Sequence, residues 1–136
     1  MLIAVDFDGT IVQHEYPLIG KEIPFATATL RKLIEDGHRL ILWTSRRGKL
    51  LDEALAWCRE RGVEFYAANK NYPEETEDMG EPRKLKVDCF IDDRNIGGLP
   101  DWGIIYQLIT KNISFQEYLL NNLAQGSSDK KKHWWQ

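Results

Sequence analysis

Two carboxylates, Asp6 and Asp8, stand two residues apart directly after an apolar run at residues 2–5. Two more, Asp92 and Asp93, directly follow a second apolar run further along the chain. Like charges at such short range repel each other unless a cation compensates them. Mg²⁺ prefers oxygen ligands and needs only a few carboxylates when phosphate and water complete its shell. The four aspartates are therefore candidate metal ligands.

A phosphorylated ligand at four carboxylates needs more positive charge than one metal ion supplies. Lys84 precedes the apolar run that leads to Asp92 and is the favoured phosphate-binding lysine. Lys86 and Lys70 stay open as alternatives. Arg46 and Arg47 follow Thr44 at the end of another apolar run, where they could bind a second anionic group or be surface charge.

The elements that must position these residues alternate between strands and helices. The sequence predicts strands at residues 2–5, 40–43, 63–67, 87–91 and 104–106, and helices at 24–37, 49–61 and 114–123. This alternation predicts an α/β fold, a three-layer α/β/α doubly wound Rossmann-like core with a mainly parallel sheet. Ligands of such folds bind at the carboxyl ends of the strands. We therefore expect Asp6, Thr44 and Asp92 to meet at one edge of the sheet.

The length of 136 residues suits one domain, which we expect over residues 1–125, with residues 126–136 as a disordered basic tail. The start of the chain has no basic region and no signal-peptide pattern, and no apolar stretch is long enough to span a bilayer. The two cysteines form neither a disulfide framework nor a zinc site. These features favour the cytoplasm, and the net charge of -3 argues against nucleic acid as a partner.

In four segments the chain resembles phosphatases of the haloacid dehalogenase (HAD) superfamily. The segment Asp-Phe-Asp-Gly-Thr at residues 6–10 matches the first motif, and Leu-Ile-Leu-Trp-Thr at 40–44 matches the second. Lys84 matches the third motif, and Phe-Ile-Asp-Asp at 90–93 matches the fourth. The first motif is highly specific, whereas the second and third are individually weak. The third departs from the commoner pattern, in which the lysine lies further upstream, and Lys70 fits that longer spacing.

The resemblance implies a role for each matching residue. Asp6 would be the nucleophile that forms an aspartyl-phosphate, and Asp8 would act as general acid and then as general base. The carboxylates would hold Mg²⁺ together with the backbone carbonyl of Asp8. The implied contacts to the phosphoryl group come from Gly9, Thr44, Ser45, Arg46 and Lys84.

The intervals between the motifs are too short for a cap domain, so the resemblance points to a capless phosphatase with an open site. The expected activity is Mg²⁺-dependent hydrolysis of a phosphomonoester, whose size the sequence does not fix. A neighbouring subunit of a homo-oligomer could supply a lid. The alternative is a non-catalytic domain of the same fold that binds a phosphorylated ligand or a partner. A phosphomutase is disfavoured because it needs a lid to keep water from its phosphoenzyme.

Overall fold

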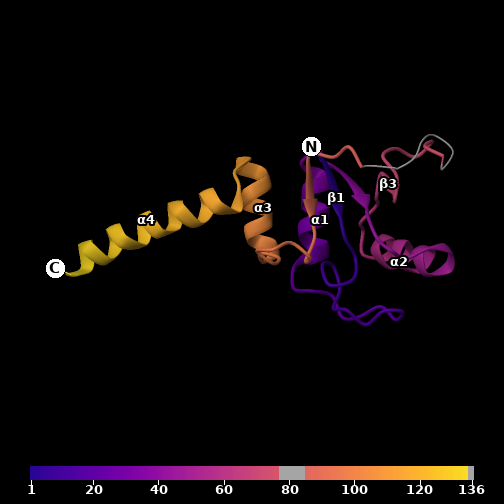
Figure 1. The fold of residues 1–136 in the computed structure, drawn as a ribbon, viewed down its shortest axis with the longest axis horizontal. Helices are drawn as coiled ribbons and strands as arrows, with labels where there is room; N and C mark the ends of the chain where they lie inside the picture. The colour runs from indigo at the N-terminus through magenta and orange to yellow at the C-terminus, as the bar shows by residue number, and fades with distance from the viewer. Residues whose placement is uncertain (77–84, 135–136) are drawn as a thin grey trace. The chain divides into compact units, whose positions relative to one another are not determined.

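The computed structural model describes residues 1–76 and 85–134, and the chain forms two compact units, Met1–Trp102 and Gly103–Gln136 (Figure 1). The first unit is built on a sheet of four parallel strands in the order β3-β2-β1-β4. The strands are β1 (Leu2–Val5), β2 (Arg39–Leu42), β3 (Ala67–Ala68) and β4 (Cys89–Ile91). The predicted α/β class with a parallel, Rossmann-like sheet is confirmed.

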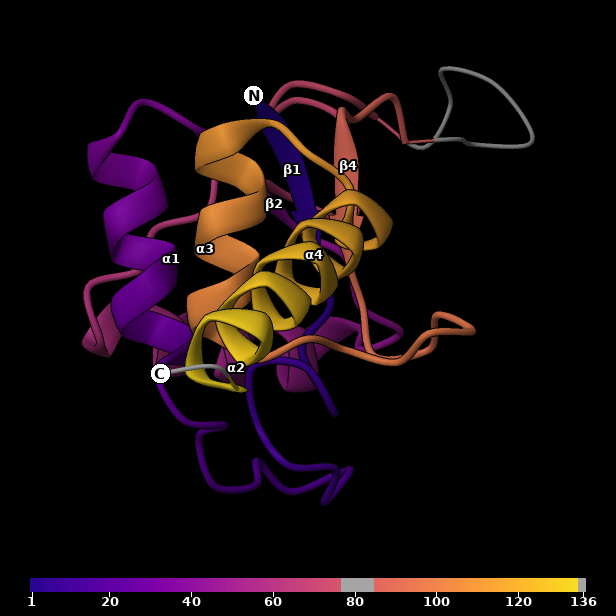
Figure 2. The ribbon, with the colours of Figure 1, turned by 90° about the vertical axis from the view of Figure 1, so that its left-hand side faces the viewer.

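The register of the sheet makes its strands end at the same level. Val5 at the end of β1 pairs with Leu42 at the end of β2 and with Ile91 at the end of β4. Figure 2 shows β1 and β4 running side by side. The polar residues that follow these strands therefore emerge along one edge, as the sequence predicts.

Two helices, α1 (Ala26–Glu35) and α2 (Gly48–Glu60), connect the strands of the first unit. The connections β1-α1-β2 and β2-α2-β3 step across the sheet in the same direction, so their right-handed crossovers put both helices on one face. Arg31 of α1 donates a hydrogen bond to the carbonyl of Arg61, just after α2, with a distance of 2.6 Å. Both helices lie within about two residues of their predicted bounds.

Two predicted strands differ from the structure. The strand expected at 63–67 is reduced to β3, because Val63 is buried as the residue that closes α2, its N–H bonding to the carbonyl of Cys58. The strand expected at 104–106 is wrong, since these residues belong to helix α3 (Trp102–Lys111). Trp102, Ile105 and Ile109 are buried at helical spacing, so the apolar pattern here has a period of three to four residues.

The second unit contains most of α3 and the helix α4 (Phe115–Trp134). The hydroxyl of Ser114 accepts a hydrogen bond from the N–H of Glu117 (3.1 Å), which confirms the predicted start of this helix. The helix runs past its predicted end near Leu123 to Trp134, through residues that the sequence predicts to be disordered. The boundary at residue 125 stays a prediction. Within residues 1–76 and 85–134, no helix has both the length and the apolar character to cross a membrane.

Candidate active site

Three carboxylates cluster at the carboxyl edge of the sheet. Asp6 follows β1, and Asp92 and Asp93 follow β4. The backbone N–H of Asp6 donates to the carbonyl of Ile91 (3.0 Å), which ties the two strand ends together. One carboxylate oxygen from each of the three aspartates lies within 4.8 Å of the others. The predicted convergence of these residues is thus present in the structure.

Thr10 holds the two acidic segments in place. Its Oγ1 lies 3.3 Å from Asp6 Oδ2 and 3.2 Å from Asp93 Oδ1, and it accepts the backbone N–H of Asp93 at 3.1 Å. The indole N–H of Trp102 in turn donates to the carbonyl of Thr10 (3.1 Å). The buried Thr10 side chain therefore fixes the position of one aspartate relative to the other.

Gly9 allows this close approach. Its φ of 87° lies in the left-handed region, and a Cβ at this position would lie 2.8 Å from Asp93 Cγ. Any other residue would therefore be strained and would displace the Asp93 carboxylate. The sequence assigns Gly9 to substrate binding, but the structure places it against the Asp93 side chain and not among the residues that line the cavity described below.

The electrostatics of the cluster favour a bound cation. Burial, followed by the charge of Asp92 and contacts with Asp93, raises the pKa of Asp6 from 3.8 to about 7. The donor atoms are all carboxylate oxygens, which suit a hard cation such as Mg²⁺. A divalent cation there would offset the repulsion that raises the pKa of Asp6.

Asp8 is held in a different way from the other three aspartates. Its carboxylate accepts two hydrogen bonds from Arg46, one from Nε to Oδ2 and one from Nη2 to Oδ1, both of 2.8 Å. The Arg46 side chain is completely buried, and that of Asp8 is 10% exposed. This is a bidentate ion pair, the strongest common form of carboxylate-arginine contact. The Asp8 carboxylate is consequently outside the cation cluster.

Arg46 also anchors the loop that precedes α1. It donates from Nη1 to the carbonyl of Pro17 (3.2 Å) and from Nη2 to that of Leu18 (3.0 Å). Its guanidinium lies 5.2 Å from the ring centroids of both Phe7 and Tyr16. Four of the five guanidinium N–H groups thus have protein acceptors. The prediction that Arg46 binds substrate is corrected, because its donors are used inside the protein.

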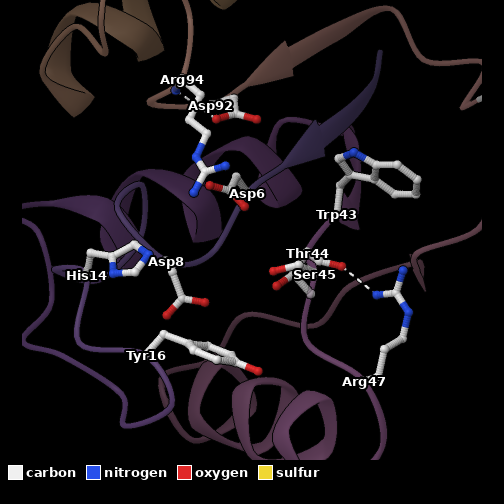
Figure 3. Close-up of a pocket in the computed structure, with 10 residues that line it drawn as sticks. All are labelled: Asp6, Asp8, His14, Tyr16, Trp43, Thr44, Ser45, Arg47, Asp92 and Arg94. Carbon is white, nitrogen blue, oxygen red and sulfur yellow. Dashed lines mark hydrogen bonds between the residues drawn. The ribbon is translucent and has the colours of Figure 1, made fainter.

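A cavity of about 510 Å³ opens beside these residues (Figure 3). Its lining residues are Asp6, Asp8, His14, Tyr16, Trp43, Thr44, Ser45, Arg47, Asp92 and Arg94. In Figure 3, the Asp6 side chain lies on the side of Asp92, whereas the Asp8 carboxylate lies on the side of Tyr16. Both aspartates of the predicted Asp-x-Asp motif thus line the cavity, and their side chains lie in different parts of the cavity.

Thr44 lies where the second motif predicts it. Its Oγ1 accepts the backbone N–H of Arg46 (3.1 Å), and its own N–H donates to Asn69 Oδ1 (2.7 Å). Asn69 adopts a left-handed φ of 54°, which asparagine tolerates better than most residues. With its oxygen accepting from the backbone, the hydroxyl proton of Thr44 is left to donate to a ligand in the cavity.

The arginine side chains that line this cavity are Arg47 and Arg94. The sequence leaves Arg47 open between anion binding and surface charge, and it does not assign Arg94 to the site. Arg94 points toward Asp6 in Figure 3, and its backbone N–H donates to Asp92 Oδ1 (2.9 Å). Arg47 is fixed through Nη1, which donates to the carbonyls of Thr44 (2.6 Å) and Arg46 (2.9 Å). His14, Tyr16 and Trp43 also line the cavity, and the sequence does not assign them to the site. The one available signal was their nearness in sequence to the first two motifs.

The three candidate lysines have different positions. Lys84 lies outside the described residues. Lys86 precedes the amino end of β4, whereas Asp92 follows its carboxyl end, and Lys86 does not line the cavity. Lys70 follows the carboxyl end of β3 and lines a neighbouring cavity that shares Trp43 and Arg47 with the first.

No protein-family model and no curated protein matches the chain. Among solved structures, a conserved protein coded by a locus from Bacteroides thetaiotaomicron is 65% identical, with a TM-score of 0.80. The match covers 85% of this chain and 94% of that chain. The chain belongs to the family of that conserved protein.

A second solved structure is D,D-heptose 1.7-bisphosphate phosphatase from B. bronchiseptica, complexed with magnesium and phosphate. It is 18% identical, with a TM-score of 0.40, and the match covers 61% of this chain and 55% of that chain. Similarity at that level assigns neither an activity nor a ligand to this chain.

Proposed function

We propose that this chain is a capless phosphatase of the HAD superfamily, which hydrolyses a phosphomonoester in the presence of Mg²⁺ through an aspartyl-phosphate on Asp6. The observation that carries the proposal is the carboxylate cluster of Asp6, Asp92 and Asp93 at the edge of a cavity that also contains two arginines. Such a cavity combines a cation site with donors for an anion, and phosphate needs both. A cytoplasmic location and a phosphorylated ligand, of a size that is left open, are part of this proposal.

The residues present fit a magnesium ion. Asp6, Asp92 and Asp93 would hold it through carboxylate oxygens. Asp8 would contribute through its backbone carbonyl only, because its carboxylate is paired with Arg46. When bound, Mg²⁺ supplies positive charge that lets the phosphoryl oxygens approach the acidic cluster.

The proposed reaction has two steps, and Asp6 and Asp8 take part in both. A carboxylate oxygen of Asp6 attacks phosphorus, the bond from phosphorus to the ester oxygen breaks, and that oxygen takes a proton from Asp8. Water next attacks the aspartyl-phosphate, giving its proton to Asp8 and releasing inorganic phosphate and free Asp6. The hydroxyl of Thr44 and the guanidinium group of Arg94 would donate to the phosphoryl oxygens.

The ion pair with Arg46 favours a second candidate, a domain that binds a phosphorylated ligand without turning it over. A carboxylate whose two oxygens both accept from one guanidinium is poorly placed to carry a proton. Catalysis therefore requires Asp8 to bind its proton on an oxygen lone pair that faces the cavity. An activated aryl phosphate avoids this requirement, because its leaving group departs without a proton.

A comparison of substrates separates the two candidates. With Mg²⁺, the phosphatase should hydrolyse both an aryl and an alkyl phosphate, whereas a binding domain should hydrolyse neither. Asp6→Asn should lose about 10³-fold or more in kcat/KM on both, since it removes the attacking oxygen at nearly constant volume. Chelator should abolish the activity, and Mg²⁺ should restore it. Activity of Asp6→Asn within tenfold of wild type would refute the assignment of the nucleophile.

A further inference from the structure

A second cavity of about 440 Å³ adjoins the proposed catalytic cavity. Trp43 and Arg47 line both cavities. The remaining lining residues of the second one are Leu51, Ala68, Asn69, Lys70, Glu75 and Thr76. A ligand in the catalytic cavity can therefore extend past the Trp43 indole into a second space without leaving the protein surface.

Arg47 presents unused donors at the boundary between the cavities. Its Nη1 is held by the carbonyls of Thr44 and Arg46, which fixes the guanidinium. In the part of the chain that the structure describes, its Nε and Nη2 donate no hydrogen bond. A guanidinium that is anchored on one side and open on the other is prepared for an anionic group.

Lys70 supplies a second positive charge in this cavity. It lies two residues after the end of β3, and the preceding Asn69 is fixed by a hydrogen bond from its N–H to the carbonyl of Leu42 (2.8 Å). No carboxylate among the described residues lies within ion-pair distance of Lys70. Lys70 lines the second cavity and not the first, so Arg47 and Lys70 together place positive charge beyond the position of the reacting phosphate.

The acidic residue of this cavity is already engaged. Glu75 accepts hydrogen bonds from the backbone N–H of Asn71 (2.7 Å) through Oε2 and from Asn71 Nδ2 (3.0 Å) through Oε1. Its carboxylate therefore stabilises the turn that it belongs to. The cavity keeps a positive character, with the apolar surface of Trp43 and Leu51 beside it.

We propose that the second cavity binds a second anionic group of the substrate, so that the substrate is a phosphomonoester with another phosphate or carboxylate at its far end. The inference rests on the proposed function for the position of the reacting phosphate. Arg47 and Lys70 bind the distal anion, and the linker between the two anionic groups packs against Trp43.

Binding of non-hydrolysable ligands tests this inference independently of turnover. The probes are alkane-α,ω-bisphosphonates from propane to octane and the alkylphosphonate of each length, measured by calorimetry with Mg²⁺. For at least one length we expect the bisphosphonate to bind roughly tenfold or more tightly than its alkylphosphonate, as charge-assisted hydrogen bonds to a second anion would give. Equal affinities at every length would overturn the inference, even if the alkyl phosphates were hydrolysed.

Substitutions then locate the effect. Lys70→Gln and Arg47→Gln should each reduce the affinity ratio of bisphosphonate to alkylphosphonate to near one. Lys49→Gln is the matched control, since it removes one exposed charge at the start of α2 without lining either cavity. We expect it to keep the ratio of the wild type. A ratio that survives both Lys70→Gln and Arg47→Gln, or that falls equally in Lys49→Gln, would contradict a second anion site.

Discussion

At the scale of single residues, the pair of Asp8 and Arg46 has the largest structural consequence. The Arg46 side chain is wholly buried, so its charge depends on Asp8 and on two backbone carbonyls for compensation. Removing one member of such a pair leaves an uncompensated buried charge, which is much more costly than removing both. Arg46 therefore fixes both the Asp8 carboxylate and the loop whose Tyr16 lines the cavity.

We expect Asp8→Ala to destabilise the protein by about 3–5 kcal/mol, because Arg46 then stays buried without its partner. The double variant Asp8→Ala/Arg46→Met should recover part of this loss, since no charge is left unpaired. Urea unfolding of the four members of this cycle measures the coupling free energy. Additive effects of the two substitutions would show that the ion pair contributes nothing to stability.

The raised pKa of Asp6 makes the stability of the folded protein depend on pH. Its pKa of about 7 in the folded protein lies above the ordinary 3.8, so the folded state retains a proton that the unfolded chain loses. Without metal, this group therefore favours folding fully below pH 3.8, and that contribution is lost as the pH rises to about 7. Asp6→Asn has no such proton, so its stability relative to wild type should increase across this pH range and then level off.

Thermal unfolding of both proteins in chelator, at a series of pH values, measures this difference. Adding Mg²⁺ at pH 8 should stabilise the wild type and leave Asp6→Asn nearly unchanged, because the variant lacks one of the three ligands. A stability difference that is independent of pH would contradict the raised pKa of Asp6.

At the scale of secondary-structure elements, the site depends on strands that end level. The apolar runs predicted β1, β2 and β4, and the rule that parallel strands bind ligands at their carboxyl ends predicted which residues meet. Arg46 and Arg47 could not be distinguished in this way, because both follow β2 and the inward one is selected by Asp8 and by the loop before α1. These are long-range contacts, and no local sequence pattern encodes them.

The turn after β1 offers a test of how the cluster is built. Gly9→Ala should largely remove the stabilisation by Mg²⁺, because the new methyl group collides with the Asp93 carboxylate. Gly37→Ala is the matched control, since Gly37 has a similar positive φ of 95° but nothing within 4 Å of an added Cβ. Both variants should be destabilised by backbone strain, as measured by their melting temperatures in chelator.

The difference between the two glycine variants isolates the contact with Asp93. We expect Gly37→Ala to retain the full shift in melting temperature on addition of Mg²⁺, and Gly9→Ala to lose most of it. Equal shifts in both variants would show that Asp93 can move without affecting the cation site.

At the scale of the whole molecule, the first unit contains every described residue of the candidate site. The walls of the cavity come from the strand ends, from the loop with His14 and Tyr16, and from the segment after β4 that contains Arg94. The sequence predicted the acidic half of this site and missed most of its cationic and aromatic half. The aspartates follow directly after apolar strands, which a sequence pattern can reveal. The arginines and aromatic residues reach the cavity from loops whose paths are set by packing.

The proposed function depends on the transfer of a phosphoryl group to the carboxylate of Asp6. The most direct measurement is rapid acid quenching of the wild-type protein with an aryl phosphate and Mg²⁺, followed by mass analysis of the peptide that contains Asp6. We predict a phosphoryl adduct on Asp6 that requires Mg²⁺ and is absent from Asp6→Asn. Hydrolysis of the same aryl phosphate at an undiminished rate by Asp6→Asn, with no adduct in the wild type, would show that Asp6 is not the nucleophile.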